Sequence, residues 1–254
     1  MNILITNDDG ISSPGIYALA KEFINEGNVI ISAPDRQRSA CSHSITMHEA
    51  ISVSKYSFFD LNCTAYAVSG TPADCVKLAY DKLFDKKIDV VISGINDGGN
   101  LGTDVLYSGT VSAAIEGAIL NIPSFAVSLV TNGNEPDFNT AAKYAHDIYI
   151  KFISNNFVNG ITLNINIPSC KKHDIKGVLP TCLGNRRYIN NYEEKKDTAG
   201  NTNYWLAGDL LKTDNGSTTD IFAVENNYVS VTPMHFELTK FDYLEVIKNW
   251  YVNV

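Results

Sequence analysis

The first 35 residues constrain the fold more than any other part of the chain, because short apolar runs alternate there with a helical pattern. Residues 3–6 have the apolar character of a strand buried in a parallel sheet. Ser12-Ser13-Pro14 is typical of a helix start, and apolar residues then recur at helical spacing until Gly27. A second apolar run follows at 29–31. We therefore predict an α/β protein, with a Rossmann-like three-layer fold and a mostly parallel sheet.

The remaining 220 or so residues divide into two regions of different character. Apolar runs predict strands at 51–53, 65–68, 88–92, 125–127 and 162–167, and periodicity predicts helices from Thr71 and over 111–120 and 139–152. Beyond residue 175 the helical periodicity fades. Residues 222–224 and 228–231 are strand-like, 185–216 is long, polar and unperiodic, and 241–254 fits a short helix or strand. We expect a single domain, 1–254, with a core over about 1–175 and a β-rich oligomerisation segment over about 176–254.

Composition excludes several classes of protein. A net charge of −8 and a pI near 5.1 argue against a general nucleic-acid binder. The five cysteines are odd in number and form no C-x-x-C pair, which favours reduced thiols over a disulfide framework. No apolar run approaches the roughly 20 residues of a membrane span. We expect a cytoplasmic protein that binds neither nucleic acid nor membrane.

Polar side chains follow three of the predicted strands. Asp8 and Asp9 end the first, residues 35–39 end the second, and Asn96 follows the run at 88–92. The carboxyl ends of parallel strands share one edge of a sheet, where ligands bind. Two carboxylates, an amide and a hydroxyl are hard oxygen donors, suited to Mg²⁺, Mn²⁺ or Ca²⁺. The alternative is that residues 7–10 form only a polar turn that caps the next helix.

A second polar cluster, Ser108-Gly109-Thr110, precedes a predicted helix. Backbone N–H groups at a helix start, with a glycine and two hydroxyls, can hold a phosphate, although Ser108 can equally be an ordinary N-cap. Glu116, inside that helix, reads as structural. Among the histidines, His43 and His235 are the two placed to matter. The chain has no P-loop, no G-x-G-x-x-G after the first strand, no H-E-x-x-H and no G-x-S-x-G.

Read together, these stretches resemble the SurE family of metal-dependent nucleotide phosphatases. The matching stretches are ILITNDDG, APDRQRSACSHSIT, SGTPADCVKLA, SGINDGGNLGTDVLYSGTVSAAIEGA, AGNTNYWLAG and YVSVTPMHFELT. The resemblance implies one divalent metal ion per subunit, Mg²⁺, Mn²⁺ or Ca²⁺, held by Asp8, Asp9, Ser39 and Asn96. It implies a phosphate site at Asn100, Ser108, Gly109 and Thr110.

The resemblance also implies a function and an assembly. Nucleoside 5′- and 3′-monophosphates would be the substrates, with short polyphosphate as a further one. The C-terminal segment would exchange between subunits of a homodimer or homotetramer. One residue departs from the family pattern, since Ala40 stands where glycine is usual after the metal-binding serine. If that position requires a positive φ, alanine strains it modestly.

These observations lead to a hypothesis of metal-assisted phosphate-monoester hydrolysis. Asp8 and Asp9 are the candidate catalytic residues, and the sequence leaves open whether one of them handles the water. Two alternatives remain: a phospho- or glycosyl transferase acting on a nucleotide, and a non-catalytic scaffold stabilised by metal.

Overall fold

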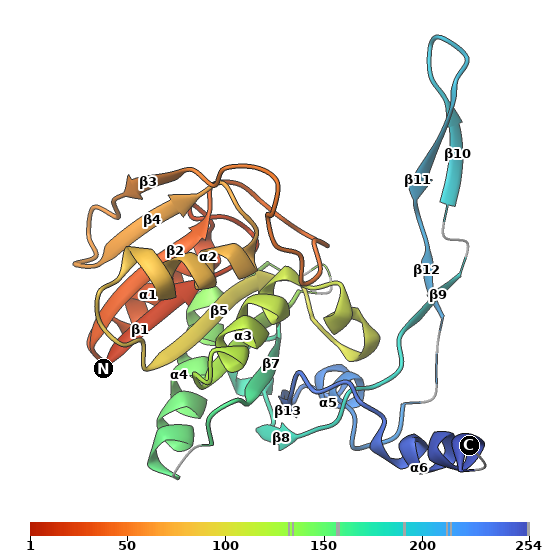
Figure 1. The fold of residues 1–254 in the computed structure, drawn as a ribbon. Helices are drawn as coiled ribbons and strands as arrows, with labels where there is room; N and C mark the ends of the chain where they lie inside the picture. The colour runs from red at the N-terminus through yellow and green to blue at the C-terminus, as the bar shows by residue number, and fades with distance from the viewer. Residues whose placement is uncertain are drawn as a thin grey trace.

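A nine-stranded mixed sheet forms the centre of the molecule (Figure 1). The computed structural model describes residues 1–131, 133, 135–155, 158–189, 192–211, 213 and 215–252. The strand order is β3-β4-β2-β1-β5-β6-β7-β13-β8, and the six strands from β4 to β7 are parallel. The predicted α/β class and mostly parallel sheet are confirmed. The strands are β1 (Asn2–Thr6), β2 (Asn28–Pro34), β3 (Val53–Tyr56), β4 (Thr64–Val68), β5 (Val90–Asp97), β6 (Ser124–Val130), β7 (Thr162–Pro168), β8 (Val178–Pro180) and β13 (Val229–Met234).

Two pairs of helices cover the faces of the sheet. The first pair, α1 (Pro14–Phe23) and α4 (Phe138–Ser154), packs together on one face. The second pair, α2 (Pro72–Leu78) and α3 (Gly109–Ile119), packs on the other face. Short helical turns are η1 (Ala79–Leu83), η2 (Gly102–Leu106) and η3 (Lys172–Asp174). The result is a three-layer fold.

The N-terminal unit forms as its sequence predicts. Strand β1 is buried from Ile3 onward, and α1 begins after Ser13, whose hydroxyl accepts from the N–H of Ile16. Pro14 occupies the first helical position, where its missing N–H costs nothing. The chain passes from β1 through α1 to β2 on one side of β1, and β5 later lies on the other side. The boundary between β1 and β5 is therefore the topological switch point, where ligands bind in open α/β sheets.

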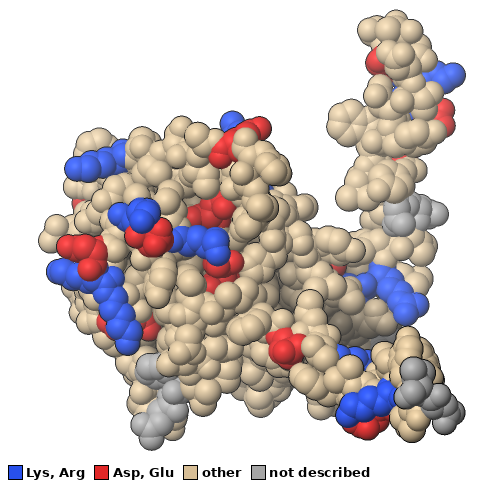
Figure 2. Space-filling view, viewed as in Figure 1, with Lys and Arg blue, Asp and Glu red and all other residues tan. Residues whose placement is uncertain are grey.

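The C-terminal third leaves the body as an extended arm (Figure 1). The hairpin β10 (Tyr192–Lys196) and β11 (Thr202–Leu206) forms its tip, and β9 (Arg187–Ile189) pairs with β12 (Asp209–Leu211) below it. The segment 185–216, predicted as unperiodic, thus contains four paired strands; its residues 190, 191, 212 and 214 lie outside the described residues. On the face that Figure 2 shows, uncharged residues cover most of the arm, although β10 carries four exposed charged residues.

Two helices follow the arm in the sequence. The prediction of a strand at 222–224 is wrong, because these residues lie in helix α5 (Asp220–Glu225). Thr219 caps α5 by accepting from the N–H of Phe222, and short apolar runs do not distinguish a buried helix from a strand. Of the two options for 241–254, the helix is observed, as α6 (Phe241–Tyr251). No helix among the described residues is both long and apolar enough to cross a membrane.

Candidate active site

A cavity of about 220 Å³ opens at the carboxyl edge of the sheet, beside the switch point. Six of the eight predicted site residues line it: Asp8, Asp9, Ser39, Asn96, Asn100 and Ser108. They come from the ends of β1, β2 and β5 and from the start of α3. Four further residues, which the sequence did not single out for the site, also line it: Gln37, Asp97, Asp104 and Tyr107. Ala40 completes the lining.

The two adjacent carboxylates occupy different environments. Asp8 is 4% exposed, and the hydroxyl of Thr110 donates to its Oδ1. Asp9 is more open; its oxygens accept from the backbone N–H of Asp97 at 3.1 Å and from the Gln37 amide at 3.3 Å. The turn is fixed by Asn7, whose side chain bonds both the N–H and the C=O of Gly10. The alternative that this turn caps α1 is wrong, because Ser13 is the N-cap, and the turn leaves both carboxylates facing the cavity.

The electrostatics of the pair favour a cation. Burial raises the pKa of Asp8 to about 6, and the neighbouring Asp9 adds to the rise, while the Thr110 hydroxyl opposes it. Burial also raises the pKa of Asp9; the backbone N–H of Asp97 and the Gln37 amide oppose the rise, and the negative charge of Asp97 adds to it. Both shifts mean that negative charge is under-compensated here. A divalent ion would supply the missing positive charge, and its preferred ligands are oxygen atoms of the kinds present.

The donor set is hard and mixed in type. The described residues contain no group of three or more His, Cys, Asp and Glu placed to hold a metal ion. The expected set instead combines two carboxylates with the Ser39 hydroxyl and the Asn96 amide oxygen. The amide nitrogen of Asn96 donates to the carbonyl of Gly98 at 2.7 Å, which orients the side chain and leaves its oxygen as the acceptor. The residues present therefore fit a hard divalent ion.

The loop that carries Ser39 is tied down on both sides. Arg38 donates its backbone N–H to the carbonyl of Asp8 at 2.7 Å. Farther along, the imidazole of His43 contacts the carboxylate of Glu116 at 2.9 Å, and Lys77 contacts the same carboxylate at 2.9 Å. Burial raises the pKa of Glu116, but the bonds from His43 and Lys77 lower it by more, so the net shift is downward. Glu116 thus anchors the loop, the structural role that the sequence indicated.

Ala40, which stands where glycine is usual, has the positive φ considered in the sequence analysis. Its φ is +54°, in the left-handed region that favours glycine. The residue lies directly after Ser39 and lines the cavity. The backbone is therefore strained at Ala40, at the edge of the site.

The start of α3 differs in detail from the predicted phosphate cradle. Ser108 lines the cavity, and its Oγ accepts from the N–H of Val111, so it is an N-cap. That bond uses a lone pair of the oxygen and not its proton. Thr110 is fully buried, and its hydroxyl is directed to Asp8 rather than outward. Gly109 lies against Asp8, because a Cβ there would be 2.8 Å from the Asp8 Cβ.

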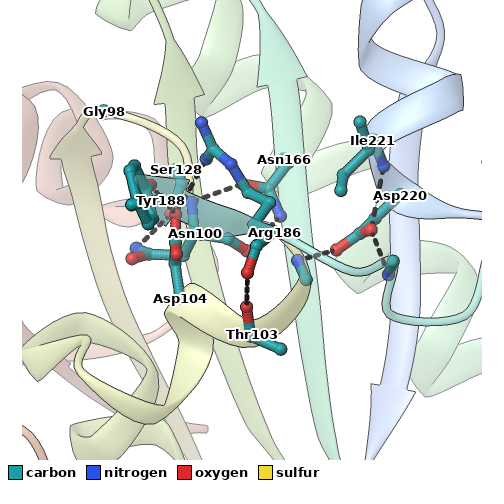
Figure 3. A network of polar contacts seen from close by, with 12 residues as sticks. Gly98, Asn100, Thr103, Asp104, Ser128, Asn166, Arg186, Tyr188, Asp220 and Ile221 are labelled. Carbon is teal, nitrogen blue, oxygen red and sulfur yellow. Dashed lines mark hydrogen bonds and ion pairs between the residues drawn. The ribbon is translucent and has the colours of Figure 1, made fainter. Parts of the chain in front are cut away.

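Asn100 lines the cavity and is held from several directions (Figure 3). Its amide nitrogen donates to Ser128 at 2.8 Å, and its backbone N–H donates to the side chain of Asn166 at 2.9 Å. The side chains of Asn164 and Asn166 donate to its carbonyl. The polar residues of β7 are buried, and two of them hold this loop.

Comparison with known proteins identifies the family. The model of the family "Survival protein SurE" matches residues 3–190. The chain belongs to the SurE family. A 5′-nucleotidase SurE of Heliobacterium modesticaldum is 46% identical over 250 residues, covering 98% of this chain and 92% of that protein. That of Natranaerobius thermophilus is 47% identical over 256 residues, covering 98% of both chains.

A solved structure agrees with the fold. The crystal structure of the SurE protein from Aquifex aeolicus has a TM-score of 0.84 to this chain at 41% identity. The match covers 99% of this chain and 100% of that one, so it includes the arm and α6 as well as the sheet. The resemblance stated from six sequence stretches is confirmed.

Proposed function

We propose that this SurE-family chain is a metal-dependent phosphomonoesterase. Its substrates would be nucleoside 5′-monophosphates, with 3′-monophosphates and short-chain polyphosphate as further ones, and its products nucleoside and phosphate. The proposal is supported by relatives named 5′-nucleotidase that match nearly the whole chain. The observation that carries it is the cavity itself. Its lining, all within the described residues, contains four carboxylates and no Lys, Arg or His.

A phosphate dianion binds such a cavity only with a cation, because like charges at a few ångströms repel strongly when partly desolvated. Asp8, Asp9, Ser39 and Asn96 would hold one divalent ion, Mg²⁺, Mn²⁺ or Ca²⁺. When bound, the ion supplies Lewis-acid activation of the phosphoryl group and lowers the pKa of a bound water. The choice among the three ions is not made by these donors, which suit all of them.

The chain's own groups have separable roles in this proposal. Thr110 holds Asp8 in place through its hydroxyl, and Asp97 and Gln37 orient Asp9. The Ser108 hydroxyl proton and the positive end of the α3 helix dipole would face phosphate oxygens, where they stabilise growing negative charge. Asp9, which is the less buried carboxylate, is the better placed of the two to accept a proton from an attacking water.

The test is phosphate release from a panel of nucleotides and polyphosphate with Mg²⁺, Mn²⁺ or chelator. We expect Asp8→Asn and Asp9→Asn each to lose about 100-fold or more in kcat/KM, since each removes a charged ligand. Asp81→Asn, on the exposed η1 turn, is the matched control and should retain full activity. Wild-type turnover in both variants, or in the chelated protein, would contradict the proposal.

The same assay separates the alternatives. A transferred phosphoryl or glycosyl product in place of free phosphate identifies a transferase. Metal-dependent melting without any phosphate release identifies a scaffold.

Strands β8 and β13 pair within this chain's own sheet. We also propose that the tip of the arm, with α6, forms contacts with other copies of the chain, giving a homodimer or homotetramer with exchange of this part of the segment from about residue 176 to 254. Large apolar side chains are exposed along it, among them Trp205 at 59%, Leu206 at 79% and Trp250 at 62%. Helix α6 buries none of its residues against the body. Exposed apolar surface of this extent marks an interface.

In this proposal residues 1–175 form the catalytic core. The protein acts in the cytoplasm, where its five unpaired cysteines stay reduced.

A further inference from the structure

Two carboxylates of the cavity, those of Asp97 and Asp104, are not ligands of the proposed metal site. Asp104 lies in η2, between the Asn100 loop and the start of α3. Residues from the root of the arm hold it (Figure 3). The guanidinium of Arg186 contacts its Oδ2 at 2.9 Å, and the hydroxyl of Tyr188 donates to the same oxygen at 2.8 Å. Each of these partners comes from more than 80 residues away in the sequence.

The segments that carry these partners are held together by hydrogen bonds between side chains and backbone groups. Thr103 donates its hydroxyl to the carbonyl of Arg186 at 2.6 Å. The buried carboxylate of Asp220 accepts from the N–H of Gly102 at 2.7 Å and from that of Gly184 at 2.8 Å. Gly102 has a φ of +54°, and a Cβ there would lie 2.6 Å from the carbonyl oxygen of Gly184. The position of Asp104 is therefore fixed before any ligand arrives.

The arrangement leaves one oxygen of Asp104 for a ligand. Both side-chain bonds that Asp104 makes with the described residues fall on Oδ2, so Oδ1 keeps its lone pairs. The adjacent guanidinium disfavours a second cation at this oxygen and offsets the carboxylate's repulsion of a phosphate. The group best matched to Oδ1 is a neutral hydroxyl donor. Carboxylates take this role toward ribose hydroxyls in dinucleotide-binding sheets.

The neighbouring residue supplies a flat apolar surface. Tyr107 also lines the cavity and is 65% exposed. An aromatic ring beside a sugar-binding carboxylate can stack on a base, because every base presents a π-face. A phosphate bound near Ser108 would place the sugar of a nucleotide next to these two residues, since η2 leads directly into α3.

We propose that Asp104 is the ribose-binding residue of the site, accepting a hydrogen bond from a sugar hydroxyl, and that Arg186 and Tyr188 of the arm root are its positioning residues. The inference rests on the proposed nucleotidase function and deepens it. Through Arg186 and Tyr188 the arm would take part in substrate recognition. The hydrogen bond to the sugar would make the enzyme prefer nucleotides over other phosphate monoesters.

The test compares adenosine 5′-monophosphate with its 2′,3′-dideoxy analogue, which keeps the base and the phosphate. We expect wild type to favour the ribonucleotide about tenfold or more in kcat/KM, mostly through a lower KM. A factor of about ten corresponds to the free energy of one good hydrogen bond to a charged group. Asp104→Ala should bring the ratio near one while retaining turnover of the dideoxy analogue. Tyr188→Phe should reduce the ratio several-fold, and Asp209→Ala, elsewhere on the arm, should leave it unchanged.

The outcomes separate the inference from the function on which it rests. Turnover of both nucleotides with no preference in wild type, or an unchanged ratio in Asp104→Ala, would overturn the inference alone. Absence of phosphate release from both by wild type overturns the proposed function. The inference is then decided by calorimetric affinities of wild type for the two nucleotides with Mn²⁺, where equal affinities overturn it. If Asp104→Ala fails to fold, Tyr188→Phe carries the test.

Discussion

Asp8 is a residue at which the proposed function and stability oppose one another. Its pKa of about 6 in the folded protein lies above the ordinary value of 3.8. The folded state therefore binds the proton more tightly than the unfolded state does. The contribution of Asp8 to the free energy of unfolding is complete below pH 3.8. It declines as the pH rises to about 6, by about 3 kcal/mol in all.

We predict that Asp8→Asn stabilises the metal-free protein at neutral pH. In urea unfolding with chelator, the free energy of unfolding of the variant relative to that of wild type should increase by about 1–3 kcal/mol from pH 4 to pH 7.5. Asparagine keeps an oxygen for the Thr110 hydroxyl and carries no charge. Adding Mn²⁺ at pH 7.5 should favour wild type instead, because only wild type binds the ion fully. A stability difference that does not change with pH would refute this account.

Ala40 offers a second test at the scale of one residue. A non-glycine residue in the left-handed region costs about 1 kcal/mol. Ala40→Gly should therefore raise the free energy of unfolding by about 0.5–1 kcal/mol, measured in denaturant with chelator present. Ala50→Gly, in an exposed stretch without a positive φ, should be neutral or slightly destabilising. If both variants lose stability alike, the backbone at Ala40 is not strained.

The sequence correctly predicted which residues lie together where their positions depend on strand ends. The edge of a parallel sheet brings Asp8, Asp9, Ser39 and Asn96 to one cavity regardless of loop detail. It did not predict the partner of Thr110, because spacing cannot say which way a hydroxyl turns. It also missed Asp104, whose position depends on the distant residues Arg186 and Tyr188. Its only mark in the sequence is a glycine-rich loop over 97–104 with an aspartate at each end.

At the scale of elements, α3 is tightly fitted against the turn after β1. A Cβ on Gly109 would lie 2.8 Å from the Cβ of Asp8 and 3.0 Å from the sulfur of Cys41. The helix start therefore sets the position of the carboxylate directly, and the two elements act as one unit.

We predict that Gly109→Ala lowers kcat/KM about 10- to 100-fold by displacing Asp8, with a parallel loss of Mn²⁺ affinity. Phosphate-release kinetics and calorimetric metal titration measure the two effects. Gly216→Ala, where a Cβ meets nothing within 4 Å, is the matched control and should change neither. Normal metal affinity in Gly109→Ala would show that the contact is dispensable.

The elements themselves were predicted unevenly. The N-terminal strands and helices formed where periodicity and capping residues placed them, because burial on both faces leaves a clear pattern. Helix α5 was taken for a strand, since six residues are too few to show a helical period. The four strands of the arm were missed as individual strands because both faces are exposed, which removes the alternation that marks a strand.

At the scale of the whole molecule, the arm has little reason to be stable alone. An isolated two-stranded hairpin is marginal in water. Contact with a second copy would bury its aromatic side chains and provide the missing stabilisation.

We predict that Tyr204→Lys with Trp205→Lys weakens self-association. The new lysines lie opposite Glu194 and Glu193 in the β10–β11 register, so the hairpin should persist while its apolar surface is lost. Light scattering on a sizing column should show a shift toward the 27.9 kDa monomer. Asn203→Glu, opposite Lys195, is the control and should assemble as wild type does. An unchanged mass in the double variant would place the interface elsewhere.

The acidic lining of the cavity has a kinetic consequence. If the proposed function holds, the two ligands must arrive in a fixed order, because the nucleotide dianion is repelled until a cation has entered. The products leave in the reverse order for the same electrostatic reason, so inorganic phosphate leaves before the ion does. The protein then behaves as a compulsory-order enzyme whose first partner is an inorganic activator. The free ion concentration gates turnover at every cycle that begins from the empty site.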